Sequence, residues 1–332
     1  MYSDEDLTQA VKQGIFSQQS VEQFRAFVAL QRDTQGVDEE NFKLIGGFND
    51  IFVVIACILL LSSAYWAFNL LHTFLAATIL PVLAWILGEF FILKRKMALP
   101  AILLMSTFVG GVFALVLMLF VSLEEYALIA ASAAAAFAAY IHWKRFSVPI
   151  TIAALTAATI GVFASTVISI YPQSNDWLLS LILVCGISAF VFAMYWDASD
   201  RQRLNYRSDV AFWLHLLSAP LIIHPIFSTL GVLNGNESLV NMGIILTLYL
   251  IMTLISIIID RRAFMVSSLV YALFALSKIL EAYGFIGYSF AITGIFIGSA
   301  LLLLSAFWHA ARAKLVSKLP HAVQLLIPKT HY

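Results

Sequence analysis

Charged residues are scarce in this chain: Asp, Glu, Lys and Arg make up 11% of its 332 residues, whereas hydrophobic residues make up 61%. Soluble domains average about 25% charged and about 45–50% apolar residues, so the composition excludes an ordinary soluble fold and favours lipid as the surroundings. Lys and Arg equal Asp and Glu at 19 each, and a chain without net charge has no long-range field to recruit nucleic acid. Both cysteines, Cys57 and Cys185, lie inside apolar runs, which argues against a disulfide framework.

Catalytic and cofactor motifs are missing as well. The sequence has no HExxH pattern, no P-loop, no dinucleotide-binding glycine pattern and no CxxC. We therefore predict no cofactor and no metal site, and an intramembrane enzyme is the least favoured class of function. The polar, acidic N-terminus lacks the short apolar stretch of a cleaved signal peptide, so the first apolar segment is expected to direct insertion.

Long apolar segments are what the chain has in abundance. From Gly47 onward there are ten, each of about 17–25 residues, which is the length needed to cross about 30 Å of hydrocarbon. They predict an all-α, polytopic membrane bundle of ten transmembrane helices at residues 47–309, followed by a cytosolic basic tail at 310–332. The ten predicted segments are Gly47–Phe68, Leu70–Leu93, Ala98–Val121, Glu125–Ile141, Val148–Ile170, Trp177–Tyr195, Asp209–Leu230, Leu239–Ile259, Phe264–Ala282 and Ile286–His309.

Basic residues fall on one side of this arrangement. With ten spans, all Lys and Arg except Lys278 lie in the N-terminal region, in alternate connections or after the last span. Because basic loops stay in the cytoplasm, this pattern predicts that both the N- and the C-terminus are cytoplasmic. The residues concerned are Lys12, Arg25, Arg32, Lys43, Lys94, Arg95, Lys96, Lys144, Arg145, Arg201, Arg203, Arg207, Arg261, Arg262, Arg312, Lys314, Lys318 and Lys329.

Residues 1–46 form a polar N-terminal segment. Gly14 is expected to end a first helix, and Ser17 is the expected N-cap of a second helix whose apolar face includes Val21 and Phe24. The segment predicts a cytosolic or interfacial helical hairpin. It either rests on the membrane domain or serves as a module that senses a signal or docks a cytosolic protein partner.

Two stretches near the N-terminus carry a family resemblance: VKQGIFSQQSVEQFRAF (Val11 to Phe27) and ENFKLIGGFNDIFVVIACILLLSSAYWAFN (Glu40 to Asn69). They resemble a bacterial family of predicted membrane proteins catalogued as a domain of unknown function. In that family a pair of cytosolic helices with a G-I-S-x-x-Q-like turn leads into a first span that ends in an aromatic residue and Asn. Here Phe16 stands within that turn. The resemblance covers roughly the first 70 residues and implies a multi-pass protein of the bacterial inner membrane, with no site residues.

The seventh apolar segment, Asp209–Leu230, combines ionisable groups with helix breakers. It contains His215, His224, Pro220 and Pro225, and each proline removes a backbone donor, so the helix is expected to bend or break near its middle. The two histidines are about 13.5 Å apart along an ideal helix. They can share a ligand in a polar cavity only if the helix unwinds at Pro220. The alternative is that each imidazole bonds to a neighbouring helix and the prolines are structural kinks.

Three more ionisable residues lie within apolar segments. Lys278 and Glu281 are three residues apart on one helix face, and they form either a lysine that extends toward the interface beside its partner or an ion or headgroup site. Glu89 either pairs with Lys96 at the cytoplasmic interface or binds a proton. These three residues join the two histidines and two prolines as candidate cavity residues.

Two classes of function remain open. A transporter or flippase-like carrier of a small or amphipathic molecule fits the ionisable groups inside the spans. A membrane sensor or scaffold that does not transport fits a partner-docking segment at residues 1–46. In both, the lipid bilayer is the principal partner, and the oligomeric state is not predicted.

Overall fold

The computed structural model describes residues 7, 10–31, 48–123, 125–171, 177–201, 203, 205–230, 238–324 and 327–328. The chain divides into two compact units, Met1–Asp38 with His331–Tyr332 and Glu39–Thr330. We call the first the N-terminal unit and the second the membrane unit. All regular structure in the described residues is helical, which confirms the all-α prediction.

The N-terminal unit contains α2, Gln18–Gln31. A preceding helical turn ends at Gly14, whose φ of 73° is a conformation that glycine adopts readily. The backbone N–H of Ile15 donates to the carbonyl of Ala10 at 2.9 Å, which closes that turn. Ser17 Oγ accepts a hydrogen bond from the N–H of Ser20 at 3.0 Å. Both the predicted helix end at Gly14 and the predicted N-cap at Ser17 are confirmed.

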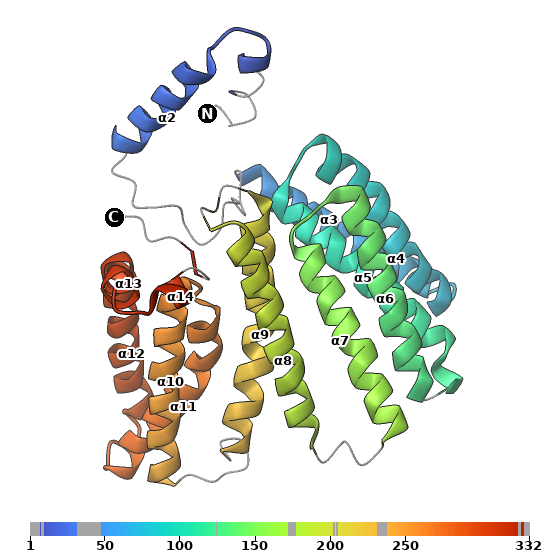
Figure 1. Cartoon of the computed structure of the whole chain (residues 1–332). Coiled ribbons are helices and arrows are strands. Elements are labelled where there is room, and N and C mark those ends of the chain that lie inside the picture. The colour runs from blue at the N-terminus through green and yellow to red at the C-terminus, as the bar shows by residue number, and fades with distance from the viewer. Residues whose placement is uncertain are drawn as a thin grey trace. The chain divides into compact units, whose positions relative to one another are not determined.

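The membrane unit has ten helices that are long and apolar enough to cross a membrane, which confirms the predicted number for the described residues. Figure 1 shows them running up and down in sequence order. They are α3 (Phe48–Asn69), α4 (Thr73–Gly88) continued by the π-helix η1 (Glu89–Lys94), α5 (Ala98–Leu119), α6 (Glu125–Phe146), α7 (Ile150–Ile170), α8 (Leu178–Ser199), α9 (Tyr206–Thr229), α10 (Leu239–Ile259), α11 (Ala263–Ala282) and α12 (Ser289–Ala306). Three short helices complete the unit: η2 (Val121–Leu123), α13 (Trp308–Val316) and α14 (His321–Gln324).

Several helix ends differ from the prediction because polar residues continue a helix after its apolar stretch has ended. The fourth segment was predicted to end at Ile141, but α6 continues to Phe146. The last was predicted to reach His309, but α12 ends at Ala306 and α13 begins at Trp308. The tail predicted at 310–332 therefore contains most of α13 and all of α14.

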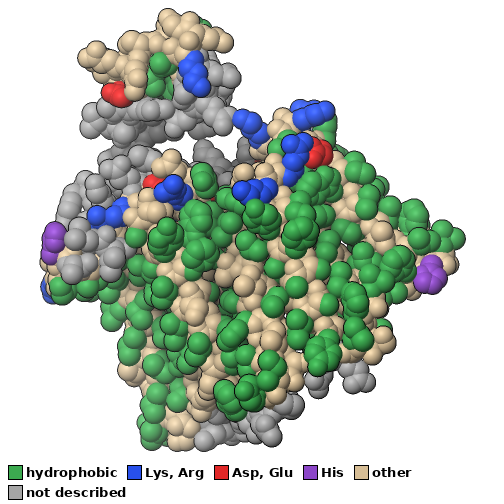
Figure 2. Space-filling model, turned by 45° about the vertical axis from the view of Figure 1, so that its right-hand side comes forward, with side chains coloured by type: hydrophobic (Ala, Val, Ile, Leu, Met, Phe, Trp, Pro, Cys, Tyr) green, Lys and Arg blue, Asp and Glu red, His purple; other side chains and the backbone are tan. Residues whose placement is uncertain are grey.

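Four turns between consecutive spans share one unusual feature. Lys96, Ser147, Arg203 and Asp260 have φ values of 52°, 53°, 54° and 57°, and they are the only non-glycine residues with positive φ in the described part of the chain. Each lies between two antiparallel spans: α4/η1 and α5, α6 and α7, α8 and α9, and α10 and α11. Alternate turns lie at the same end of an antiparallel bundle, so these four turns share one end. We call it the basic end because its turns contain Lys and Arg. Figure 2 shows Lys and Arg side chains gathered there, over sides covered by hydrophobic side chains.

Helix α9 lies at the centre of the membrane unit. Half of the residues in its most apolar window are buried, against 11% in α3 and in α12, and α9 packs against α7, α8 and α11. Gly186 of α8 permits the closest approach, because a Cβ at this position would lie 2.8 Å from the backbone carbon of Leu221 in α9. Side chains on the facing surfaces of α8 and α9 are thereby held in contact.

Candidate functional site

Ionisable side chains are buried together at the basic end of α8 and α9. They come from four parts of the chain: α8, α9 with the turn before it, the turn between α10 and α11, and α13. We call this set the ionic cluster. Its members are Asp197, Arg203, His215, Asp260, Arg261 and Arg312, each no more than 6% exposed, together with Trp308.

Asp197, in the last turn of α8, is the centre of the first half of the cluster. Its Oδ2 accepts a hydrogen bond from Nε2 of His215 in α9 at 2.8 Å, and its Oδ1 lies 2.5 Å from an Nη atom of Arg261. The same guanidinium donates to the backbone carbonyl of Ser208 at 3.1 Å. Nε of Arg261 also donates to Oδ2 of Asp197, at 3.4 Å. An ionised carboxylate can only accept hydrogen bonds, so Asp197 accepts one from His215 and two from Arg261.

Asp260 is the centre of the second half. Its Oδ2 accepts a hydrogen bond from Arg203 at 2.8 Å, and its Oδ1 accepts one from the indole Nε1 of Trp308 at 2.7 Å. Arg203 also donates to the backbone carbonyl of Asp260 at 3.0 Å, and Nε of Arg312 lies 3.7 Å from Oδ1. The left-handed backbone of Asp260 turns its side chain and its carbonyl toward the same arginine.

Burial and charge together determine the ionisation of the groups in the turns. Burial, reinforced by the like charge of Arg261, lowers the pKa of Arg203 to about 10, so this guanidinium remains charged at neutral pH. Burial also lowers the pKa of Arg312. Burial alone would raise the pKa of Asp260, but the charges of Arg203 and Arg312 and the hydrogen bond from Trp308 outweigh it and hold that pKa below its usual value. The second half is therefore a set of charged groups.

Two arginines donate hydrogen bonds to the segment after α13. Arg201 donates to the carbonyls of Gln324 and Ile327 at 2.8 and 3.1 Å, and Arg312 donates to the carbonyl of Pro328 at 2.6 Å. The side chain of Ile327 is 3% exposed. Arg312 thus contacts both Asp260 and the C-terminal segment.

Proton exchange is the chemistry that this arrangement fits best. His215 is fully buried and bonded to a carboxylate through Nε2, while its Nδ1 has no hydrogen-bond partner among the described residues. Imidazole can gain or lose a proton near neutral pH. No group of three or more His, Cys, Asp or Glu side chains in the described residues is arranged to hold a metal ion.

The two histidines predicted as one site are separate. His224 is exposed on the surface of α9, where Nδ1 is hydrogen bonded to the hydroxyl of Tyr271 at 2.8 Å. The predicted break in the helix is wrong, because α9 is continuous through both Pro220 and Pro225. Without unwinding, the helix keeps His215 and His224 apart, and each bonds to a neighbouring helix, as the alternative had it.

The other predicted residues form two ion pairs outside the cluster. Glu89 accepts two hydrogen bonds from Arg145 of α6, at 2.8 and 2.6 Å, so its partner is Arg145 and the predicted pairing with Lys96 is replaced. Nζ of Lys278 lies 3.4 Å from Oε2 of Glu281, which confirms the predicted pair. Glu281 also accepts a hydrogen bond from Ser289 of α12 at 3.1 Å.

Most of the ionic cluster was missed from the sequence. Its arginines were interpreted only as cytoplasmic charges that set the orientation, and Asp197 lies just beyond the predicted end of the sixth segment at Tyr195. A signal was nevertheless present: acidic residues stand beside arginines in both turns of the basic end that contain Arg203 and Asp260. Opposite charges in turns between apolar spans are candidates for buried pairs.

No family model, curated protein or solved structure matches this chain. The resemblance of the first 70 or so residues to a bacterial membrane protein family therefore stays a prediction.

Proposed function

We propose that the chain is a multi-pass protein of the bacterial inner membrane with its basic end, and both termini, in the cytoplasm. The clustering of Lys and Arg at the basic end supports this orientation, because positively charged connections are retained on the cytoplasmic side. The inner-membrane location rests on the family resemblance of the N-terminal residues.

The function that we propose is carriage of a small or amphipathic molecule across this membrane, coupled to the protonation of the ionic cluster. The observation that carries the proposal is the burial of Asp197, His215 and Arg261, which are 0–1% exposed, with both His215 and Arg261 hydrogen bonded to Asp197. Ionisable groups at such positions are costly and are typical of substrate pathways and proton relays. His215 is the residue expected to exchange the proton, and Asp197 and Arg261 orient it.

Transport by reconstituted protein tests this proposal. The full chain is placed in liposomes under an imposed pH gradient, and two fluorescent probes are followed: ethidium, an amphipathic cation, and an NBD-labelled phosphatidylcholine whose flipping is read by dithionite quenching. We expect one of the probes to cross faster than in protein-free liposomes. His215→Gln should abolish the dependence of this rate on the pH gradient.

His224→Gln is the matched control, because it is the same substitution in the same helix at a residue outside the cluster. It should leave the rate and its pH dependence unchanged. If neither probe crosses faster than in protein-free liposomes, or if the two substitutions act alike, the proposal is wrong.

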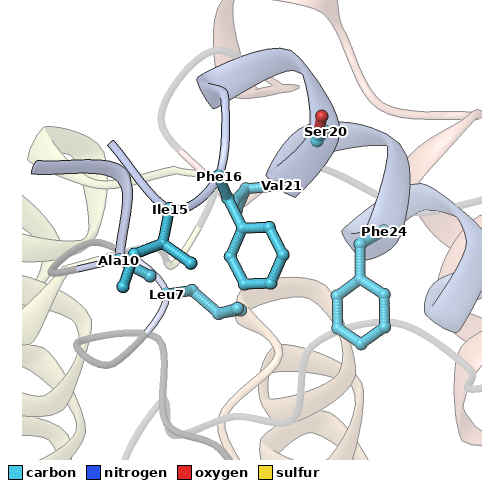
Figure 3. Close-up of a pocket in the computed structure, with 7 residues that line it drawn as sticks. All are labelled: Leu7, Ala10, Ile15, Phe16, Ser20, Val21 and Phe24. Atoms are coloured by element: carbon cyan, nitrogen blue, oxygen red, sulfur yellow. The ribbon is translucent and has the colours of Figure 1, made fainter. Parts of the chain in front are cut away.

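A second candidate function, a membrane sensor or scaffold, is favoured by the surface of the N-terminal unit. An apolar pocket of about 870 Å³ lies on this unit. Figure 3 shows the residues that line it: Leu7, Ala10, Ile15, Phe16, Ser20, Val21 and Phe24. Ile15, Phe16 and Phe24 are each about half exposed or more, and exposed apolar patches of this kind often bind proteins. Removing residues 1–40 should then abolish function while the membrane unit stays folded. Probe transport that survives this deletion would favour the carrier.

A further inference from the structure

Two turns of the basic end form one exposed cationic surface on the first half of the membrane unit. Lys94 ends η1 and is followed by Arg95 and Lys96. Lys144 and Arg145 lie in the last turn of α6, and all five side chains are exposed. We call these five residues the basic patch. None of them belongs to the ionic cluster, so what they do is independent of the proposed transport.

Close helix contact makes the basic patch continuous. Gly88, at the end of α4, lies against Phe146 of α6, and a Cβ at Gly88 would be 3.2 Å from its ring. Directly beyond this contact, Arg145 makes its two hydrogen bonds to Glu89. Residues 89–94 form a π-helix. This element is rare in proteins, and where it occurs it is often part of a functional site. The cations of the two turns are therefore held side by side.

Each turn presents an apolar column that ends in a cation. Ile86, Phe90 and Lys94 follow at four-residue spacing along α4 and η1, and Nζ of Lys94 lies 5.9 Å from the centre of the Phe90 ring. On α6, Tyr140 precedes Lys144 in the same way, with Nζ 5.6 Å from the ring centre. Phe90 and Tyr140 are 43% and 47% exposed. Both columns thus run from an exposed apolar surface to a positive end.

The positive charge of the basic patch is only partly balanced by nearby carboxylates. Among the described residues, Lys94, Arg95 and Lys144 have no carboxylate within ion-pair distance, and Glu89 is engaged by Arg145. Asp50, at the start of α3, is a further acid in the first half of the membrane unit and is 8% exposed. A ligand that fits both columns has a negatively charged head and an apolar chain.

We propose that the basic patch binds an anionic phospholipid, with its phosphate at Lys94, Arg95 and Lys144 and its acyl chains against Phe90 and Tyr140. Basic side chains at the cytoplasmic ends of membrane helices attract anionic headgroups, and aromatic side chains lie at the same depth as the headgroups. The Glu89–Arg145 pair positions the two columns and does not itself bind the lipid.

Native mass spectrometry of the full chain in dodecyl maltoside tests the proposal with three probes: dioleoyl phosphatidylglycerol, dioleoyl phosphatidylcholine and inorganic phosphate. The wild type should retain phosphatidylglycerol in preference to phosphatidylcholine. Lys94→Gln with Lys144→Gln should weaken phosphatidylglycerol binding by about tenfold or more. Inorganic phosphate should not displace the lipid, because it lacks the chains that contact the rings.

Lys314→Gln with Lys318→Gln is the matched control, since it removes the same charge from exposed residues elsewhere at the basic end. This variant should bind phosphatidylglycerol like the wild type. If the two double variants lose affinity equally, binding is a general effect of charge and the proposal fails. It also fails if the lipids bind equally, or if phosphate competes. Arg95→Gln with Lys144→Gln repeats the test should the first pair fail to fold.

Discussion

The turns of the first and the second half of the membrane unit share a backbone conformation and differ in their surroundings. Lys96 and Ser147, in the first half, and Arg203 and Asp260, in the second, all have φ between 52° and 57°. The first two are exposed, whereas the last two are buried in the ionic cluster. The tight turn between two spans therefore does not itself require buried charge. The second half adds buried charge to a connection that the first half makes with exposed charge only.

The residue after the left-handed position shows how the two halves are stabilised. Met97 and Val148 follow it in the first half and bury apolar side chains, whereas Arg261 follows Asp260 and is equally buried. A buried apolar side chain needs no partner, but a buried guanidinium does, and Asp197 supplies it. Because buried ion pairs often stabilise no better than apolar packing, the charges of the second half favour a functional explanation over a purely structural one.

Removing the carboxylate of Asp197, in the second half of the membrane unit, should have the largest effect on stability. Asp197→Asn leaves the buried Arg261 guanidinium without its counter-charge, and breaking a buried ion pair in this way costs about 3–5 kcal/mol. The free energy of unfolding can be measured by denaturant titration of the purified protein in mixed micelles. We expect the variant to unfold at much lower denaturant concentration than the wild type.

Glu89→Gln is the control from the first half. It removes the same charge from an ion pair of similar length, Glu89–Arg145, but the two side chains are 36% and 52% exposed, so water can replace the partner. The unfolding midpoint should barely change. Equal losses in Asp197→Asn and Glu89→Gln would show that burial is not what distinguishes the two halves.

Asp260→Gly should have the second largest effect. Glycine adopts the left-handed backbone without strain, but the substitution removes the carboxylate that binds Arg203 and Trp308. The lost pairing outweighs the relieved strain, and we expect a net loss of about 2–4 kcal/mol in the free energy of unfolding. A variant that is as stable as the wild type would mean that the turn at Asp260 is held by its backbone alone, as in the first half.

Acid should loosen the second half before the first. The pKa of Asp260 lies below its usual value of 3.8, so the folded state binds a proton less readily than the unfolded state does. The stabilisation from this carboxylate is complete above about pH 4 and is lost as the pH falls through the lowered pKa. Hydrogen exchange at decreasing pH should show α13 opening before α5. In Asp260→Asn this pH dependence should disappear, and its persistence would assign the effect to another carboxylate.

The sequence predicted the spans because membrane crossing depends on a local property, the length of an apolar stretch. It predicted the turn at Gly14 and the cap at Ser17 for the same reason, since these depend on neighbouring residues only. The continuity of α9 through Pro220 and Pro225 was not predictable in this way. Neighbouring helices in a membrane bundle can accommodate the missing donors, and this depends on the packing of the whole unit.

The candidate site required contacts that the sequence does not display. His215 was identified as unusual, but its partner Asp197 lies 18 residues away on another helix, and Arg261 lies 64 residues from Asp197. These residues come into contact only when α8, α9 and the turn before α11 pack together. His224 has the same residue type in the same helix, yet it faces outward, so residue type alone did not separate the two histidines.

The smallest expected effect is a gain in stability in the first half. Ser147 has a φ of 53° and is exposed, and the hydrogen bond from its hydroxyl to the carbonyl of Trp143 is long, at 3.3 Å. Ser147→Gly relieves the left-handed strain at little loss, so we expect the free energy of unfolding to rise by about 0.5–1 kcal/mol. Ser147→Ala keeps the strain and removes the same hydroxyl, so it should not stabilise. We expect the free energy of unfolding to rise in Ser147→Gly and to fall in Asp260→Gly. This result would show that the same backbone turn is strained in both halves and that buried charge stabilises the turn in the second half only. A fall in both variants would mean that the turn at Ser147 depends on contacts of its side chain.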